Sequence, residues 1–160
     1  MGILVGIDVE EEDISKVEGH IDRKPLADVV AGWIWLPGVV NMLGLSSGSA
    51  DALKRINMNA FANSPLLTEN DRSKMHQDVW QDPRNLKVAL EELRVAFEKI
   101  RSTPSLMNQM ETGEASDHFD RDSLELGAYE DGIEDAIRMC EWAAKLGKRV
   151  KNHTRIEKRC

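Results

Sequence analysis

The stretch DPRNLKVALEELRVAFEKIRSTP, residues 82–104, decides the fold because it specifies a long amphipathic helix almost completely. Asp82 can cap the helix, Pro83 suits the first helical position because its missing N–H costs nothing there, and Pro104 prevents continuation. Large apolar residues recur at helical spacing: Leu86, Leu90, Leu93, Phe97 and Ile100. This spacing places all of them on one face, so we expect that face to be buried.

Other parts of the chain also have helical patterns. A second amphipathic helix is predicted from about Tyr129 to Leu146, with Gly147 as its C-terminal stop and with an inward face of Ile133, Ile137, Cys140 and Ala144. Shorter helices are predicted at three places: Ala50–Phe61, Glu69–Trp80 and the stretch that contains Ile14, Val17 and Ile21. Only Ile3–Ile7 has the pattern of a strand. The predicted fold is therefore mainly α, a bundle of about five or six helices with at most one short N-terminal strand.

The composition is typical of a single globular domain. The chain has 160 residues, 41% hydrophobic and 31% charged, and this length allows a self-sufficient core. We expect one helical domain over residues 1–150 and a basic, frayed tail over residues 151–160. Cys140 and Cys160 match no disulfide framework or metal spacing, and no N-terminal signal peptide is recognised. These features predict a cytoplasmic protein.

One apolar segment, Val29–Leu45, contains a single polar side chain, Asn41. Its 17 residues fall short of the roughly 20 that a membrane span needs, and a Pro-Gly pair interrupts it. We therefore expect a buried segment and no membrane association, with Trp33 and Trp35 as anchors in the core or at an interface.

Gly44, Ser46 and Gly48 form the pattern G-x-S-x-G, the nucleophile elbow of serine hydrolases, and Asp117 and His153 follow in the required order. An elbow needs a strand of a parallel sheet that ends in a strained turn beside an oxyanion hole. A helical chain of this length cannot supply that sheet. We therefore predict no catalytic residues here and expect the next helix to be capped by one of three serines: Ser46, Ser47 or Ser49.

The chain offers no clear metal or cofactor site, because its four histidines lack metal-ligand spacing. An alternative remains an all-helical, magnesium-dependent enzyme similar to nucleoside triphosphate pyrophosphohydrolases. Carboxylates on two helices would hold the ion: Glu91, Glu92 and Glu98 with Glu130, Glu134 and Asp135. The family pattern E-E-x-x-E, however, requires glutamate at Val95. Most of these carboxylates also lie opposite the apolar faces, where a solvated helix surface is the ordinary explanation.

The charge of the chain is distributed unevenly. The net charge is −7, but residues 145–160 contain seven basic side chains and one acid, so residues 1–144 carry −13. Between Glu111 and Asp135 there are ten acidic side chains and only one basic residue, Arg121. Such a surface repels nucleic acid and accelerates encounters with a basic protein. We therefore predict a basic protein partner.

In its size, its charge and the sequence AYEDGIEDAIRMCEWAAKLGKRV, residues 128–150, the chain resembles immunity proteins of bacterial toxin–immunity systems. The resemblance implies a protein that neutralises a cognate toxin by covering its active site. An interaction module for another partner is a further alternative. The residues predicted to bind the partner are acids of the segment described above: Asp117, Asp120, Asp122, Glu125, Glu130 and Asp131.

Overall fold

The computed structural model describes residues 3–12, 37–60, 69, 80–113, 116 and 119–156. Within these ranges the fold has six helices and a pair of strands: β1 (Ile3–Val9), α2 (Pro37–Leu43), α3 (Ser47–Ala60), α5 (Pro83–Ser102), α6 (Pro104–Thr112), α7 (Arg121–Glu125), α8 (Ala128–Leu146) and β2 (Val150–Ile156). The predicted mainly α class is confirmed. The predicted helix near residues 14–21, most of the predicted Glu69–Trp80 helix, Trp33 and Trp35 lie outside the described residues.

Helix α5 forms as its sequence predicts. The side chain of Asp82 caps it by accepting a hydrogen bond of 2.9 Å from the backbone N–H of Arg84, and Pro83 is its first residue. The five side chains of the predicted inward face have no exposed surface: Leu86, Leu90, Leu93, Phe97 and Ile100. Helix α5 is therefore the element around which the core is built.

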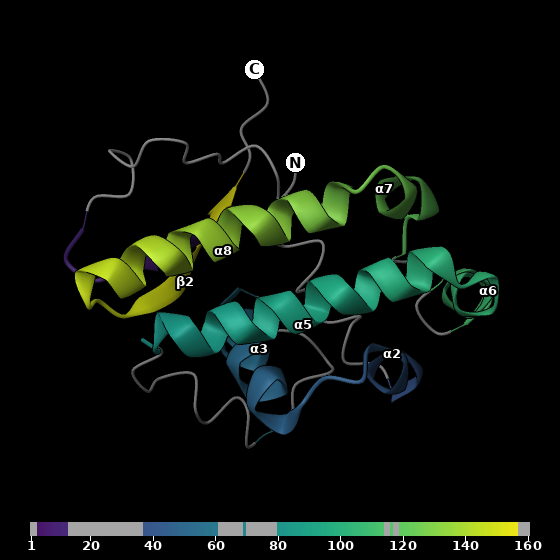
Figure 1. The fold of residues 1–160 in the computed structure, drawn as a ribbon, viewed down its shortest axis with the longest axis horizontal. Coiled ribbons are helices and arrows are strands. Elements are labelled where there is room, and N and C mark those ends of the chain that lie inside the picture. Colours follow the sequence, from purple (N-terminus) through teal and green to yellow (C-terminus); the bar gives the residue numbers. More distant parts are fainter. Residues whose placement is uncertain are drawn as a thin grey trace.

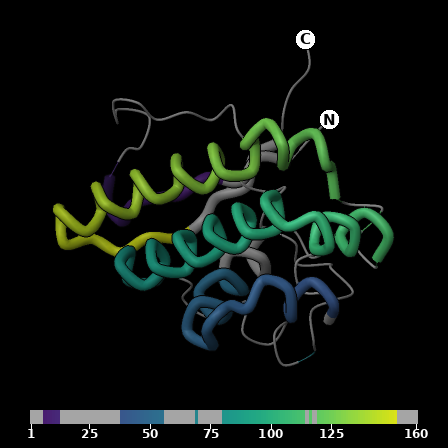
Figure 2. The backbone as a smooth tube through the Cα atoms, turned by 45° about the vertical axis from the view of Figure 1, so that its right-hand side comes forward, coloured from purple at the N-terminus to yellow at the C-terminus, as the bar shows by residue number. Residues whose placement is uncertain are grey.

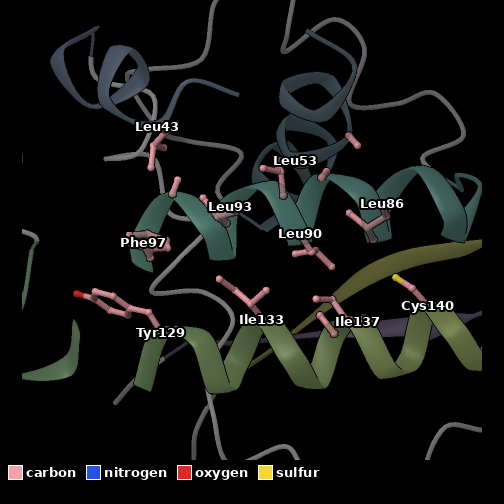
Figure 3. Packing of buried hydrophobic residues seen from close by; sticks show 14 of the residues in the cluster. Leu43, Leu53, Leu86, Leu90, Leu93, Phe97, Tyr129, Ile133, Ile137 and Cys140 are labelled. Carbon is pink, nitrogen blue, oxygen red and sulfur yellow. The ribbon is translucent and has the colours of Figure 1, made fainter. Parts of the chain in front are cut away.

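The helices lie in three layers, with α5 in the middle (Figures 1 and 2). Helix α8 runs antiparallel to α5 on one side, and α2 and α3 lie on the other side. Figure 3 shows the apolar side chains between these layers, among them Leu43, Leu53, Leu93, Phe97, Tyr129, Ile133 and Ile137. The prediction for Ala144 is wrong, because the helical period brings Ala143 to the buried face and leaves Ala144 exposed.

Strands β1 and β2 form an antiparallel sheet in which Ile3 pairs with Ile156 and Val9 pairs with Val150. Both ends of the Val9–Val150 pair are buried in the core. Helix α8 packs on β1, and helix α3 packs on β2. Residues 151–156, predicted to belong to a frayed tail, are therefore a strand of the fold, and that prediction is corrected.

The pairing of the two strands is favoured by opposite charges. Lys151 lies opposite Asp8 in the register, and Nη2 of Arg149 lies 2.5 Å from Oε2 of Glu10. The ammonium group of Lys151 also lies 4.7 Å from the ring centroid of Trp80. Opposite charges on neighbouring strands attract, so Arg149 and Lys151 are held against the folded chain. They are not simply solvated basic side chains.

The C-terminal part of the apolar segment Val29–Leu45 forms helix α2. Pro37 begins this helix, Val39 and Leu43 are buried in the core, and Gly44 follows with a φ of 59°. Burial is therefore confirmed for Val39 and Leu43, whereas Val40 is 39% exposed. None of the described helices has both the length and the apolar character that crossing a membrane requires.

Candidate functional site

The described members of the predicted partner-binding set gather at one end of the helical layers, where α6, α7 and the start of α8 meet (Figure 1). We call this region the acidic end. Helix α7 begins there because Asp120 accepts a hydrogen bond of 3.0 Å from the backbone N–H of Asp122. Gly127, with a φ of 76°, allows the chain to turn directly from α7 into α8. The hydroxyl of Tyr129 accepts a hydrogen bond of 3.0 Å from the backbone N–H of Asp120, which fixes α7 against α8.

Two arginines form ion pairs with several of the acids. The guanidinium group of Arg121 lies 2.8 Å from Glu111 and 2.7 Å from Glu125, so it links α6 to α7. Arg101, on α5, lies 2.5 Å from Glu130 at the start of α8. The hydrogen bond that Arg101 donates to Glu130 raises the pKa of Arg101, and the one that Arg121 donates to Glu125 raises the pKa of Arg121. These contacts show that part of the acidic charge stabilises the folded chain itself.

The acids between Glu111 and Asp135 therefore have more cationic partners than Arg121, the one basic residue within that stretch. Besides Arg101, two arginines at other positions contact acids of the same segment: Arg94 lies 3.9 Å from Glu134, and Arg138 pairs with Asp135. The Arg94–Glu134 pair could not be recognised in the sequence, because the two residues lie far apart in the chain, on α5 and α8. The repulsion within the segment is consequently smaller than the sequence alone suggests.

Two of the predicted partner-binding residues have structural roles. The carboxylate of Asp120 accepts hydrogen bonds from the Ser123 hydroxyl and from the backbone of Asp122, and the Ser123 bond is the main cause of its lowered pKa. The Glu130 side chain is only 14% exposed in its ion pair with Arg101. Asp117 lies outside the described residues.

The remaining predicted residues differ in their exposure. Asp122 and Glu125 are exposed, and Asp131 is half-buried. Among the described residues, no cation lies within ion-pair distance of the Asp122 carboxylate. Sequence reasoning missed Leu126, which is 83% exposed in the turn between α7 and α8. The acidic end therefore presents both free charge and an exposed apolar side chain to solvent.

The serines of the G-x-S-x-G pattern form a structural corner between α3 and α5. Glu92 accepts hydrogen bonds of 3.0 Å from the backbone N–H and from the hydroxyl of Ser46, and a further hydrogen bond from the hydroxyl of Ser49. The Ser46 hydroxyl in turn accepts a bond of 3.3 Å from the backbone N–H of Ser49 in the first turn of α3. These bonds, led by the one from the Ser46 backbone, lower the pKa of Glu92. The prediction that a serine caps this helix is confirmed.

The same corner lacks the geometry of a nucleophile elbow. Helix α2 precedes Ser46, whereas an elbow follows a strand of a parallel sheet. The two described strands form an antiparallel pair and lie at other positions of the chain. The hydrogen bonds of Ser46 and the elements around it therefore both agree with a helix cap.

Five of the six carboxylates of the alternative magnesium site, all except that of Glu98, are held in separate interactions. Glu92 binds the serine corner, Glu91 lies 3.7 Å from Lys87, and the acids of α8 pair with arginines as described above. Across the described ranges, the structure has no group of three or more histidine, cysteine or carboxylate side chains that could hold a metal ion. Cys140 is buried, and burial raises the pKa of its thiol to about 12, so its reactive thiolate form is suppressed.

Comparison of the chain with protein families, with curated proteins and with solved structures found no match. A functional assignment therefore depends on the residues and geometry of the chain itself.

Proposed function

We propose that this protein is an acidic binding protein that neutralises a basic protein partner, as the immunity proteins of bacterial toxin systems do. The partner would be a cognate toxin whose active site becomes covered. The observation that carries the proposal is the excess of acidic over basic side chains at the acidic end, where Asp122 and Glu125 of α7 are both exposed. Six described acids gather there against Arg101 and Arg121: Glu111, Asp120, Asp122, Glu125, Glu130 and Asp131.

The distribution of these charges supports binding through the end of the molecule. Asp122 and Glu125 lie on α7, outside the core, and both are exposed. Glu125 forms an exposed pair with Arg121 of the same helix, and such a pair contributes little to stability, so the carboxylates of both Asp122 and Glu125 remain accessible to a partner. Exposed charges of one sign mainly increase the rate of association, and salt screens them over roughly 8 Å at physiological ionic strength.

The proposal is tested by reversing the accessible charges of α7. A partner is first isolated by co-purification from the native host, and its association is then followed by surface plasmon resonance at low and physiological salt. We expect the double variant Asp122→Lys and Glu125→Lys to reduce the association rate roughly tenfold or more at low salt, with a smaller change in the dissociation rate. Asp120 is left unchanged, because it caps α7.

In a matched control variant, the charges of two acids outside the acidic end are reversed. Glu12 is exposed and follows β1, and Asp51 forms an i,i+4 pair with Arg55 on α3, as Glu125 does with Arg121 on α7. The control variant Glu12→Lys and Asp51→Lys therefore changes the net charge by the same amount. Equal losses in both variants would show that only net charge matters and that the acidic end is no specific interface. An association rate that does not respond to salt would also contradict the proposal.

A further inference from the structure

A small apolar pocket lies beside the acidic end, between α2 and the C-terminal half of α6. It has a volume of about 280 Å³, and its walls are formed by Gly38, Val39, Met42, Gln109, Met110, Thr112 and Gly113. Val39 and Met110 are buried members of the core, whereas Gln109 and Thr112 are exposed at the opening. The pocket therefore extends from the surface to the hydrophobic core.

The size and lining of the pocket define the chemistry of its occupant. Its volume falls just below the range of roughly 300–1,000 Å³ that is typical of small-molecule sites. The pocket is lined by Met42 of α2 and by Met110 of α6. Methionine side chains are flexible and polarisable, so they adapt to apolar groups of different shape. These features fit one large apolar side chain of a protein better than a free metabolite.

The charges next to the pocket indicate which kind of residue would flank that side chain in the partner. Helix α6 lies between α2 and α7 at one end of the molecule (Figures 1 and 2). Glu111 follows Met110 directly on α6, and its carboxylate contacts Arg121 of α7. From Pro104 to Asp131 the chain carries eight acids and one arginine, a net charge of −7. A segment that enters the pocket from this side is favoured if it carries positive charge.

We infer that the pocket between α2 and α6 receives one large apolar side chain from a basic partner, flanked in that partner by lysine or arginine. This inference rests on the proposed function and adds an anchor to it. The acids accelerate the encounter, and the pocket slows dissociation by burying the apolar anchor. The two contributions can therefore be measured separately.

The test uses two synthetic lysine-rich peptides that differ only at a central residue, which is phenylalanine in one and serine in the other. Affinity is measured by fluorescence anisotropy at low salt. Methyl NMR of the protein with labelled methionines reports where each peptide binds. We expect the phenylalanine peptide to bind about 10- to 100-fold more tightly, the range for burying one such side chain. We also expect the methyl signals of Met42 and Met110 to shift and that of Met139, buried on α8, to remain.

Two single variants provide a matched control. Gln109→Trp fills the pocket opening from an exposed position, whereas Asn108→Trp places the same side chain on the neighbouring exposed position, outside the pocket lining. Gln109→Trp should remove the preference for phenylalanine and keep the salt-dependent binding of both peptides. Asn108→Trp should preserve the preference. The NMR measurement on the unchanged protein decides the matter even if one of the variants folds poorly.

The outcomes distinguish a failure of the pocket inference from a failure of the proposed function. If both peptides bind equally and salt weakens both, the acidic end attracts basic chains but the pocket inference is overturned. If the phenylalanine peptide binds more tightly without shifting Met42 and Met110, the anchor lies elsewhere and the inference is also overturned. If neither peptide binds at low salt, the proposed function and the pocket inference fail together.

Discussion

The interface between α5 and α8 and the acidic end are stabilised in different ways, although α8 belongs to both and Arg101 of α5 reaches the acidic end. The interface is apolar: Leu90, Phe97, Ile133 and Cys140 have no exposed surface. The acidic end is held by hydrogen bonds and by ion pairs such as Arg101–Glu130. Apolar packing is not directional and tolerates little loss of volume, whereas ion pairs near the surface each contribute modestly.

Because of this difference, most of the residues that stabilise the fold are not residues of the proposed binding surface. Residues that face the core carry most of the free energy of unfolding, so α7 can carry exposed charges without endangering the fold. Helix α5 belongs to both regions, because Ile100 is buried in the core and the next residue, Arg101, reaches Glu130. Variants of the two regions should therefore differ strongly in stability.

The largest effect is expected from Phe97→Ala. The Phe97 side chain is fully buried, and its ring centroid lies 5.4 Å from that of Tyr129. Its removal leaves a cavity, so we expect the free energy of unfolding, measured by urea denaturation, to fall by about 3–5 kcal/mol. Leu126→Ala is the control at the acidic end, and its effect should stay within about 0.5 kcal/mol because Leu126 is 83% exposed. Similar losses of unfolding free energy in the two variants would contradict the difference between the α5–α8 interface and the acidic end.

An intermediate effect is expected from Glu130→Gln. This change removes the charge from the most buried ion pair of the acidic end and leaves Arg101 without its carboxylate partner. We expect a loss of about 1–3 kcal/mol at pH 7 by urea denaturation. Glu125→Gln, in an exposed pair with Arg121, should cost less than about 1 kcal/mol. If both substitutions have the same effect, partial burial does not strengthen the first pair.

The smallest expected effect concerns pH and the serine corner. Hydrogen bonds from Ser46 and Ser49 lower the pKa of Glu92 below its ordinary value of 4.5. The stability that they provide is therefore present above that value and is lost as the pH falls through the lower pKa of the folded state. We expect Glu92→Gln to reduce the loss of stability between about pH 5 and pH 3, measured by urea denaturation. An unchanged pH dependence would show that other carboxylates, such as Asp82, account for the acid response.

Local patterns in the sequence are sufficient to predict α5 and α8, the two longest of the described helices. The cap, the first proline and the apolar spacing of α5 all lie within one stretch of chain, so no distant contact is needed to recognise them. Helix α6 was missed because Pro104 was interpreted only as a stop. The same proline is also favourable at the first position of a new helix, and Thr103 lies between the two helices as the cap residue of both.

Contacts between distant residues were not predictable in the same way. Strand β2 pairs with β1 near the other end of the chain, and a local pattern of basic residues cannot reveal that partner. At the candidate site, the acidic segment was evident from composition, but Arg94 and Arg101 reach it from α5. The bond between Ser46 and Glu92 likewise spans 46 positions. Only the folded structure shows which charges remain free.

The pairing of β1 with β2 also has a consequence for synthesis on the ribosome. Strand β1 is made first, but its partner begins only at Val150, so β1 waits for roughly 140 residues, about 7–30 s at ordinary elongation rates. Helix α5 can already form in the last third of this interval, whereas α8 is completed at Leu146, just before β2 begins. During that time the edge of β1 and the buried side chains Ile7 and Val9 lack their final cover. A nascent chain stalled before Val150 should therefore be the form most exposed to chaperones and to aggregation.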